Sequence, residues 1–255
     1  MKKAIFITVR TGSTRLPKKC LLKIQGKPVI EHLIDRVKGS ALKDAIVLCT
    51  TRLKEDDILC NIAEKNKIDY FRGPVEDKLA RWLGAAERFR VDFFITADGD
   101  DIFCEPQLID LAFRQYAQGG ADFIEAQGLV CGAFTYGIKT QALRKACEIK
   151  ATTDTEMQWV YFKDTHLFKV QELKGIPAIY KRPEIRMTLD YPEDFDFFSA
   201  VFFGLKKKKY FNLKDIILFL DKHPEVIKIN QHLQKKFLDN QKRKTRLVVK
   251  NEKSQ

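Results

Sequence analysis

The sequence predicts an α/β fold in which helices flank a mostly parallel β-sheet. Three mostly apolar runs, at residues 4–9, 45–50 and 91–97, have the length and composition of strands that are covered on both faces. Segments with helical spacing follow them, and strands that alternate with helices pair in parallel through right-handed crossovers. The chain of 255 residues, 45% hydrophobic and 31% charged, is long enough for one such domain with additions.

The first half of the chain alternates regularly between strands and helices. Pro28 opens a segment whose apolar residues recur at helical spacing, and proline suits the first turn of a helix. The predicted order is strand 4–9, a helix from 28, strand 45–50, helix 55–65, strand 68–71, helix 76–89, strand 91–97 and helix 106–118. This order is Rossmann-like, and such sheets bind ligands at the carboxyl ends of their strands.

The second half is less regular. It predicts strands at 121–126, 133–138 and 185–189, an extended segment at 168–172, and helices at 141–149, 194–203, 212–221 and 224–238. We therefore expect a main domain over 1–205 with a small α+β insertion at about 130–170, C-terminal helices over 206–239 and a flexible basic tail over 240–255.

The net charge of +12 is concentrated in two places. Residues 231–255 carry eight Lys or Arg and two acids, which gives +6, and the lysine run 206–209 adds +4. The body of the chain is therefore almost neutral. A nucleic-acid partner is the alternative that the tail suggests, but Phe237 is the only aromatic residue there, so stacking platforms for bases are absent.

Cysteine usage and hydropathy bear on the location of the protein and on a membrane partner. The six cysteines are scattered without a C-x-x-C pair, which is typical of reduced thiols in a cytoplasmic protein. No apolar run approaches the roughly 18 residues of a membrane-spanning helix, so we expect no membrane partner.

A basic loop, Arg10 to Lys19, follows the first predicted strand. Gly12 permits a tight turn there, and Ser13 and Arg15 lie beside it. Arginine makes forked contacts with phosphate and lysine acts as a point charge, so the loop is suited to wrap a triphosphate. It has neither Walker A nor G-x-G-x-x-G spacing, and a solvated basic turn is the alternative.

Carboxylates follow two other predicted strands. Asp98, Asp100 and Asp101 come directly after 91–97, and Asp190 comes after 185–189. Clustered carboxylates repel one another unless a cation offsets their charge, and Mg²⁺ bound by one or two of them together with substrate phosphates would do so. Ordinary acidic helix starts are the alternative. Together with the basic loop, these strand ends predict a site for a nucleoside triphosphate with Mg²⁺.

The same residues carry a resemblance to a known family. Arg10-x-Gly-Ser-Thr-Arg-Leu-Pro-x-Lys19, followed by Gly26-Lys27-Pro28, resembles the nucleotide-binding opening of the CMP-sugar synthetases. These include CMP-sialic acid and CMP-Kdo synthetases and especially the spore coat polysaccharide biosynthesis protein F group of cytidylyltransferases. The resemblance continues at 71–73, 95–100, 154–156 and 189–194, and it implies a sheet of the nucleotide-diphospho-sugar transferase type.

The resemblance implies a role for individual residues. It assigns Arg10 and Lys19 to the phosphates of CTP, with Gly12, Ser13 and Arg15 in the same loop, and it makes Arg10, Lys19 and Asp100 catalytic. Asp100 and Asp190 would hold Mg²⁺, with Asp98 a competing match for Asp100. Cytidine would be held by Thr50, Thr51, Arg72 and Asp77.

The reaction that the resemblance implies is cytidylyl transfer. An oxygen of an acidic sugar, or of a sugar or polyol phosphate, attacks the α-phosphorus of CTP and pyrophosphate leaves, which yields an activated precursor for polysaccharide or glycan synthesis. The resemblance also implies a homodimer, for which 130–170 is our candidate interface. Asp98-Gly99-Asp100 is a D-x-D motif, so a glycosyltransferase is the alternative enzyme. Thr155-Glu156-Met157 departs from the family pattern on the acceptor side.

Overall fold

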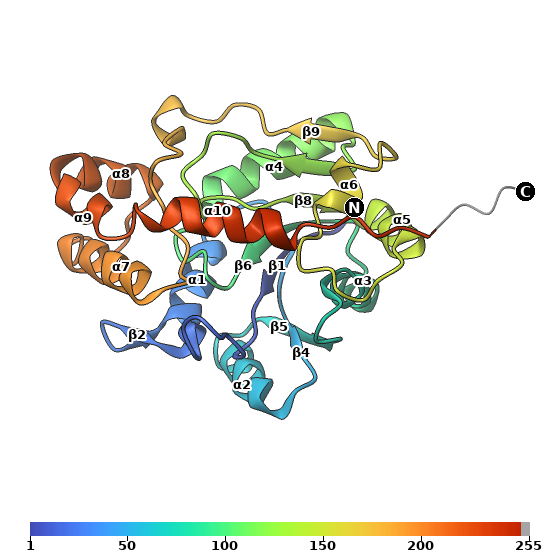
Figure 1. Ribbon diagram of the computed structural model, residues 1–255, viewed down its shortest axis with the longest axis horizontal. Helices are drawn as coiled ribbons and strands as arrows, with labels where there is room; N and C mark the ends of the chain where they lie inside the picture. Colours follow the sequence, from blue (N-terminus) through green and yellow to red (C-terminus); the bar gives the residue numbers. More distant parts are fainter. Residues whose placement is uncertain (251–255) are drawn as a thin grey trace, which may run out of the picture.

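A seven-stranded, mostly parallel sheet forms the centre of the computed structural model, which describes residues 1–250 (Figure 1). Its strand order is β5-β4-β1-β6-β8-β7-β9, with β8 antiparallel to both neighbours. The strands are β1 (Lys3–Thr8), β4 (Ala45–Thr51), β5 (Asp69–Gly73), β6 (Phe93–Asp98), β7 (Phe123–Glu125), β8 (Gly137–Lys139) and β9 (Val170–Glu172). The predicted fold class is confirmed.

Strand β1 lies in the middle of the parallel part. Ile5 is paired with Ile46 of β4 on one side and with Ile95 of β6 on the other. Ile5 belongs to the core on one face of the sheet and Phe6 to the core on the other, because successive side chains of a strand point to opposite faces. Both cores exclude water from the strand, which explains its uninterrupted apolar sequence.

Helices cover both faces of the sheet. Apolar side chains of α1 (Val29–Lys38), α2 (Asp57–Lys65) and α4 (Pro106–Gly119) join the core on the Ile5 face. Those of α3 (Lys78–Phe89), α5 (Thr140–Ile149) and α6 (Val160–Lys163) join the core on the Phe6 face. The remaining short elements of this half are the hairpin β2 (Lys23–Ile24) and β3 (Lys27–Pro28) and the 3-10 turns η1 (Lys19–Leu21) and η2 (Lys54–Asp56).

Two strands expected in the second half are largely absent from the described residues. Residues 133–136 precede β8 rather than belonging to it, and 185–189 forms only an isolated bridge between Arg186 and Cys131. The two segments still lie close together at this bridge: Gly132 has a φ of +87°, and a Cβ there would lie 2.0 Å from the Met187 carbonyl oxygen, so only glycine fits at this close approach.

The C-terminal third is helical and ends differently from the prediction. It contains η3 (Ala178–Tyr180), α7 (Pro192–Gly204), α8 (Leu213–Lys222), α9 (Pro224–Lys228) and α10 (Leu233–Lys244). The expected boundary at 239 is wrong, since α10 continues to Lys244 and the chain then runs extended to Lys250. Residues 240–244 are therefore helical, the flexibility expected for the chain beyond them stays a prediction, and 251–255 lie outside the described residues. None of the helices within 1–250 has the length and apolarity needed to cross a membrane.

Candidate active site

A cavity of about 570 Å³ opens at the carboxyl ends of β1 and β6. Several separate segments of the chain line it, including the loop after β1, the loop after β6 and helix α10. The structure thus brings together most of the residues that the sequence predicts for the site, namely Arg10, Gly12, Ser13, Arg15, Lys19, Asp98, Asp100 and Asp190. This convergence is expected, because residues that follow parallel strands meet at the same edge of the sheet.

Gly99 holds the two strand ends together. Its N–H donates to the Thr8 carbonyl oxygen at 2.8 Å, and a Cβ at this position would lie 2.7 Å from the Val9 Cβ. Any larger residue would push the loop after β6 away from β1. Glycine at this position therefore sets Asp98 and Asp100 beside the basic loop.

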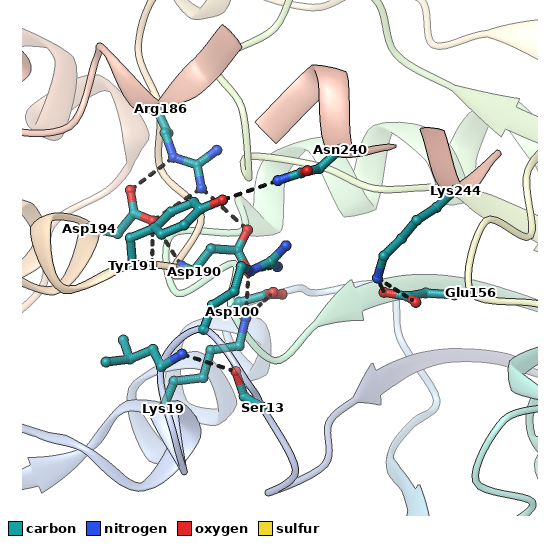
Figure 2. Close-up of polar contacts among 12 residues, drawn as sticks. Ser13, Lys19, Asp100, Glu156, Arg186, Asp190, Tyr191, Asp194, Asn240 and Lys244 are labelled. Atoms are coloured by element: carbon teal, nitrogen blue, oxygen red, sulfur yellow. Dashed lines mark hydrogen bonds and ion pairs between the residues drawn. The ribbon is translucent and has the colours of Figure 1, made fainter. Parts of the chain in front are cut away.

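Lys19 lies between two carboxylates from different parts of the sequence (Figure 2). Its Nζ is 2.7 Å from Asp100 Oδ2 and 2.9 Å from Asp190 Oδ1, and Arg15 also forms an ion pair with Asp190. Burial alone would lower the pKa of Lys19, but the charges of Asp100 and Asp190 outweigh it and raise the pKa above its ordinary value. Lys19 is therefore a fixed positive charge in the wall of the cavity.

The two carboxylates that flank Lys19 differ in their surroundings. Burial favours the neutral form of both carboxyl groups. At Asp190 the charges of Lys19 and Arg15 outweigh the effect of burial, so its pKa is lowered. At Asp100 burial prevails over the attraction of Lys19, and the nearby carboxylates add to it, so its pKa is raised. Lys19 thus lies between Asp190, which favours the ionised form, and Asp100, which holds its proton more tightly.

A buried arginine orients Asp190. The Arg186 side chain is fully buried; its Nη2 lies 3.3 Å from Asp190 Oδ2 and its Nε lies 2.9 Å from Asp194 Oδ1. Asp194 Oδ2 in turn accepts the backbone N–H groups of Asp190 at 2.8 Å and of Tyr191 at 3.0 Å. The start of α7, which the sequence marks as an ordinary acidic helix start, is thus also the support of a site carboxylate (Figure 2).

Sequence reasoning assigned no individual role to three side chains of the cavity wall. Lys78 pairs with Asp98 at 2.8 Å, and Arg81, in the same helix, is buried with its Nε unpartnered among the described residues. Asp101 is buried, and burial together with the charges of Asp100 and Asp98 raises its pKa well above the ordinary value. Lys78 and Arg81 lie one turn apart on a predicted helix, which is the signal that could have found them.

The four residues predicted to hold cytidine do not line the cavity. Thr50 and Thr51 are fully buried, and Thr51 donates to Asp56. Arg72 donates to the carbonyl oxygens of Thr51 at 2.9 Å and Leu53 at 2.8 Å. The fourth, Asp77, caps α3 and pairs with Lys150. Three of the four therefore have a structural partner, whereas the Thr50 hydroxyl is buried without one among the described residues, and the cytidine assignments stay predictions.

The architecture agrees with that of a solved cytidylyltransferase. A cytidylyltransferase structure from Leptospira borgpetersenii matches with a TM-score of 0.79 and 26% identity over 89% of this chain and 97% of that one. A family model described as cytidylyltransferase matches residues 4–243. The chain belongs to the cytidylyltransferase family, and the resemblance argued from the sequence is confirmed.

Two relatives show which members of the family the chain is similar to. The spore coat polysaccharide biosynthesis protein SpsF of Bacillus subtilis is 27% identical over 226 residues, which are 86% of this chain and 94% of SpsF. The 3-deoxy-manno-octulosonate cytidylyltransferase of Chloroherpeton thalassium is 26% identical over 186 residues, 71% of each chain.

Proposed function

We propose that this protein transfers the cytidylyl group of CTP to an acidic sugar or to a sugar or polyol phosphate and releases pyrophosphate. The product would be a CMP- or CDP-activated precursor for surface polysaccharide or glycan synthesis. The observation that carries the proposal is the placement of Lys19 between Asp100 and Asp190 in a cavity that Arg10 and Arg15 also line. Such a site offers cations to a triphosphate and carboxylates to the metal that accompanies it.

The donor set fits Mg²⁺. Oxygens of Asp100 and Asp190 lie within 2.9 Å of one Lys19 nitrogen, so they already converge on a single positive centre. No three His, Cys, Asp or Glu side chains within 1–250 are placed to hold a metal by themselves. Mg²⁺ usually takes one or two carboxylates and completes its shell with phosphate and water. Asp100 and Asp190 would hold it, and bound there it would withdraw charge from the phosphate oxygens.

The residues of the cavity suit each part of the transfer. Arg10 and Arg15 make forked contacts with the triphosphate, and Lys19 adds an ammonium group whose charge the site holds fixed. The acceptor oxygen attacks the α-phosphorus, the bond from that phosphorus to the leaving pyrophosphate breaks, and the three cations offset the charge that develops on the departing oxygens. The mechanism needs no covalent intermediate on the protein.

The names of the relatives support the acceptor class. One relative acts in spore coat polysaccharide biosynthesis, and another is a cytidylyltransferase for 3-deoxy-manno-octulosonate, an acidic sugar. A homodimer that uses 130–170 and a cytoplasmic location belong to the same proposal. The six free thiols support that location.

A glycosyltransferase that uses Asp98-Gly99-Asp100 is the weaker candidate. Asp98 pairs with Lys78 while Asp100 pairs with Lys19, so the two carboxylates serve different cations. Sugar transfer from a nucleotide-sugar donor without any turnover of CTP would favour this candidate.

The test is pyrophosphate release from CTP with a panel of acidic sugars and polyol phosphates. Arg10→Ala, Lys19→Ala and Asp100→Asn should each lower the rate at least ~100-fold, because each removes charge that the transition state needs. Lys18→Ala is the matched control, since Lys18 is exposed and outside the cavity lining. Near-normal turnover in any of the three variants would remove that residue from the site.

A further inference from the structure

Helix α10 forms one wall of the cavity, although its sequence marks it only as part of a basic C-terminal end. Figure 1 shows it in red, crossing the molecule from the α7–α9 side toward α5. Six of its residues line the cavity, namely Gln234, Phe237, Leu238, Asn240, Gln241 and Lys244. They face the loops that follow β1 and β6 across the space in which the substrates must meet.

Side chains of α10, and the chain that follows it, contact the rest of the protein. Arg186, which supports Asp190, places its Cζ 4.6 Å from the centre of the Phe237 ring, and Asn240 donates to the Tyr191 hydroxyl at 3.3 Å. Beyond the helix, the Val248 carbonyl oxygen accepts the Ala151 N–H at 2.9 Å. The position of α10 is therefore coupled to the carboxylates of the site.

The cations of the cavity are unevenly distributed. Five lining cations come from the first third of the chain, namely Arg10, Arg15, Lys19, Lys78 and Arg81. Among the described residues that line the cavity, Lys244 is the only Lys or Arg that follows them in the sequence. Among the described residues, Lys244 is thus the one cation that the second half of the chain supplies to the cavity.

The ion pair that Lys244 makes is easy to exchange. Its Nζ lies 3.1 and 3.3 Å from the two oxygens of Glu156, and the side chains are 52% and 47% exposed (Figure 2). Such exposed pairs contribute little stability, so an incoming anion can replace the Glu156 carboxylate at small cost. Two further glutamates line the cavity, Glu76 and Glu125, and Glu125 is already bound to Lys163 at 2.6 Å.

We propose that Lys244 binds the anionic group of the acceptor, a carboxylate or a phosphate, in exchange for Glu156. Trp159 and Leu238, which also line this side, offer apolar surface to the carbon skeleton of a sugar or polyol. The family match ends at residue 243, so Lys244 lies just beyond the part of the chain that the family model describes. The inference rests on the proposed cytidylyl transfer and names the residue that selects its acceptor.

The experiment measures pyrophosphate release with four acceptors: 3-deoxy-manno-octulosonate, N-acetylneuraminate, ribitol 5-phosphate and uncharged ribitol. Lys244→Ala should raise the KM for the accepted anion about tenfold, as expected for one lost charge-assisted contact, and should leave the KM for CTP within about twofold. Lys244→Arg should restore most of the loss. Glu156→Gln should lower the acceptor KM, because the competing carboxylate is gone.

Lys242→Ala is the matched control, since Lys242 is exposed on the same helical turn and does not line the cavity. Equal kinetics of the Lys244→Ala and Lys242→Ala variants would overturn the inference while leaving cytidylyl transfer intact. Turnover with ribitol but not with any anion would do the same. Absence of pyrophosphate release from the unmodified protein with all four acceptors would instead overturn the proposed function, and the inference with it.

Discussion

Single residues in this site matter through the charges that they balance. Lys19 joins Asp100 to Asp190, and Arg186 contacts the other oxygen of Asp190, so this carboxylate lies between the mostly buried Lys19 and the fully buried Arg186. Asp98, the competing match for Asp100, contacts Lys78 instead. A motif alone cannot decide between two neighbouring aspartates, because the choice depends on which side chain faces a partner from another segment.

Replacing Arg186 should destabilise the protein strongly. Arg186→Met leaves Asp194, which is fully buried, without its charged partner, and losing one member of a buried pair costs about 3–5 kcal/mol. The free energy of unfolding in urea measures the effect. Arg182→Met is the control, because Arg182 pairs with the exposed Glu184 and Asp221 and should cost less than about 1 kcal/mol. Equal losses for both variants would contradict the supporting role of Arg186.

At the scale of elements, helix ends place the site. Helix α7 begins at Pro192 with Asp194 bonded back to the N–H of Asp190, which aims that carboxylate at the cavity. Helix α3 begins just after Asp77, whose Oδ1 accepts the Ala80 N–H at 3.0 Å, and it presents Lys78 and Arg81 to the cavity. Side chains that cap helices thus position the groups that line the site.

The capping role of Asp77 can be separated from the cytidine contact that the resemblance implies. Asp77→Ala removes the cap and leaves the partly buried Lys150 without its partner, so the free energy of unfolding should fall by about 1–3 kcal/mol. The KM for CTP should stay within about twofold. The exposed Asp35 serves as control, and Asp35→Ala should change neither quantity. A raised KM for CTP without loss of stability would restore the cytidine assignment.

The whole molecule brings its opposite charges together at one end of the sheet. Most of the net charge of +12 lies outside this cluster, on α10, the chain beyond it and the lysine run 206–209. Of that surplus, Lys244 is the only residue within 1–250 that lines the cavity. Net charge is therefore a poor guide to the ligand here, and its distribution over the fold is a better one.

Ligand binding should stabilise the whole fold in a metal-dependent way. A hundredfold excess of CTP over its Kd, with Mg²⁺, adds about 2.7 kcal/mol by mass action, or roughly 5 to 10 °C in Tm for a chain of this length. Thermal unfolding with and without EDTA measures the shift. Asp190→Asn should lose most of it, whereas Asp196→Asn, an exposed change on α7, should retain it. A shift that EDTA leaves unchanged would argue against Mg²⁺ at Asp100 and Asp190.

The sequence predicted the sheet well where its signal is local. The runs that became β1, β4 and β6 are mostly apolar because helices cover both faces of the sheet, and the loops after them carry the chemistry. Prediction failed at 185–189, where apolar and polar residues alternate as in a strand but the segment forms only an isolated bridge to Cys131. It also failed beyond 239, where polar residues of α10 line a cavity instead of fraying.

Sequence alone determined the fold class, the family and the basic and acidic loops of the site, because apolar periodicity and short motifs are written in neighbouring residues. Only the tertiary structure decided that Lys19 lies between Asp100 and Asp190, that Arg186 supports Asp190, and that α10 lines the cavity with Lys244. Most of these relations join distant residues: Lys19 is 81 positions from Asp100 and 171 from Asp190. No local pattern contains them, since they arise when the packed sheet brings separate chain segments to one edge.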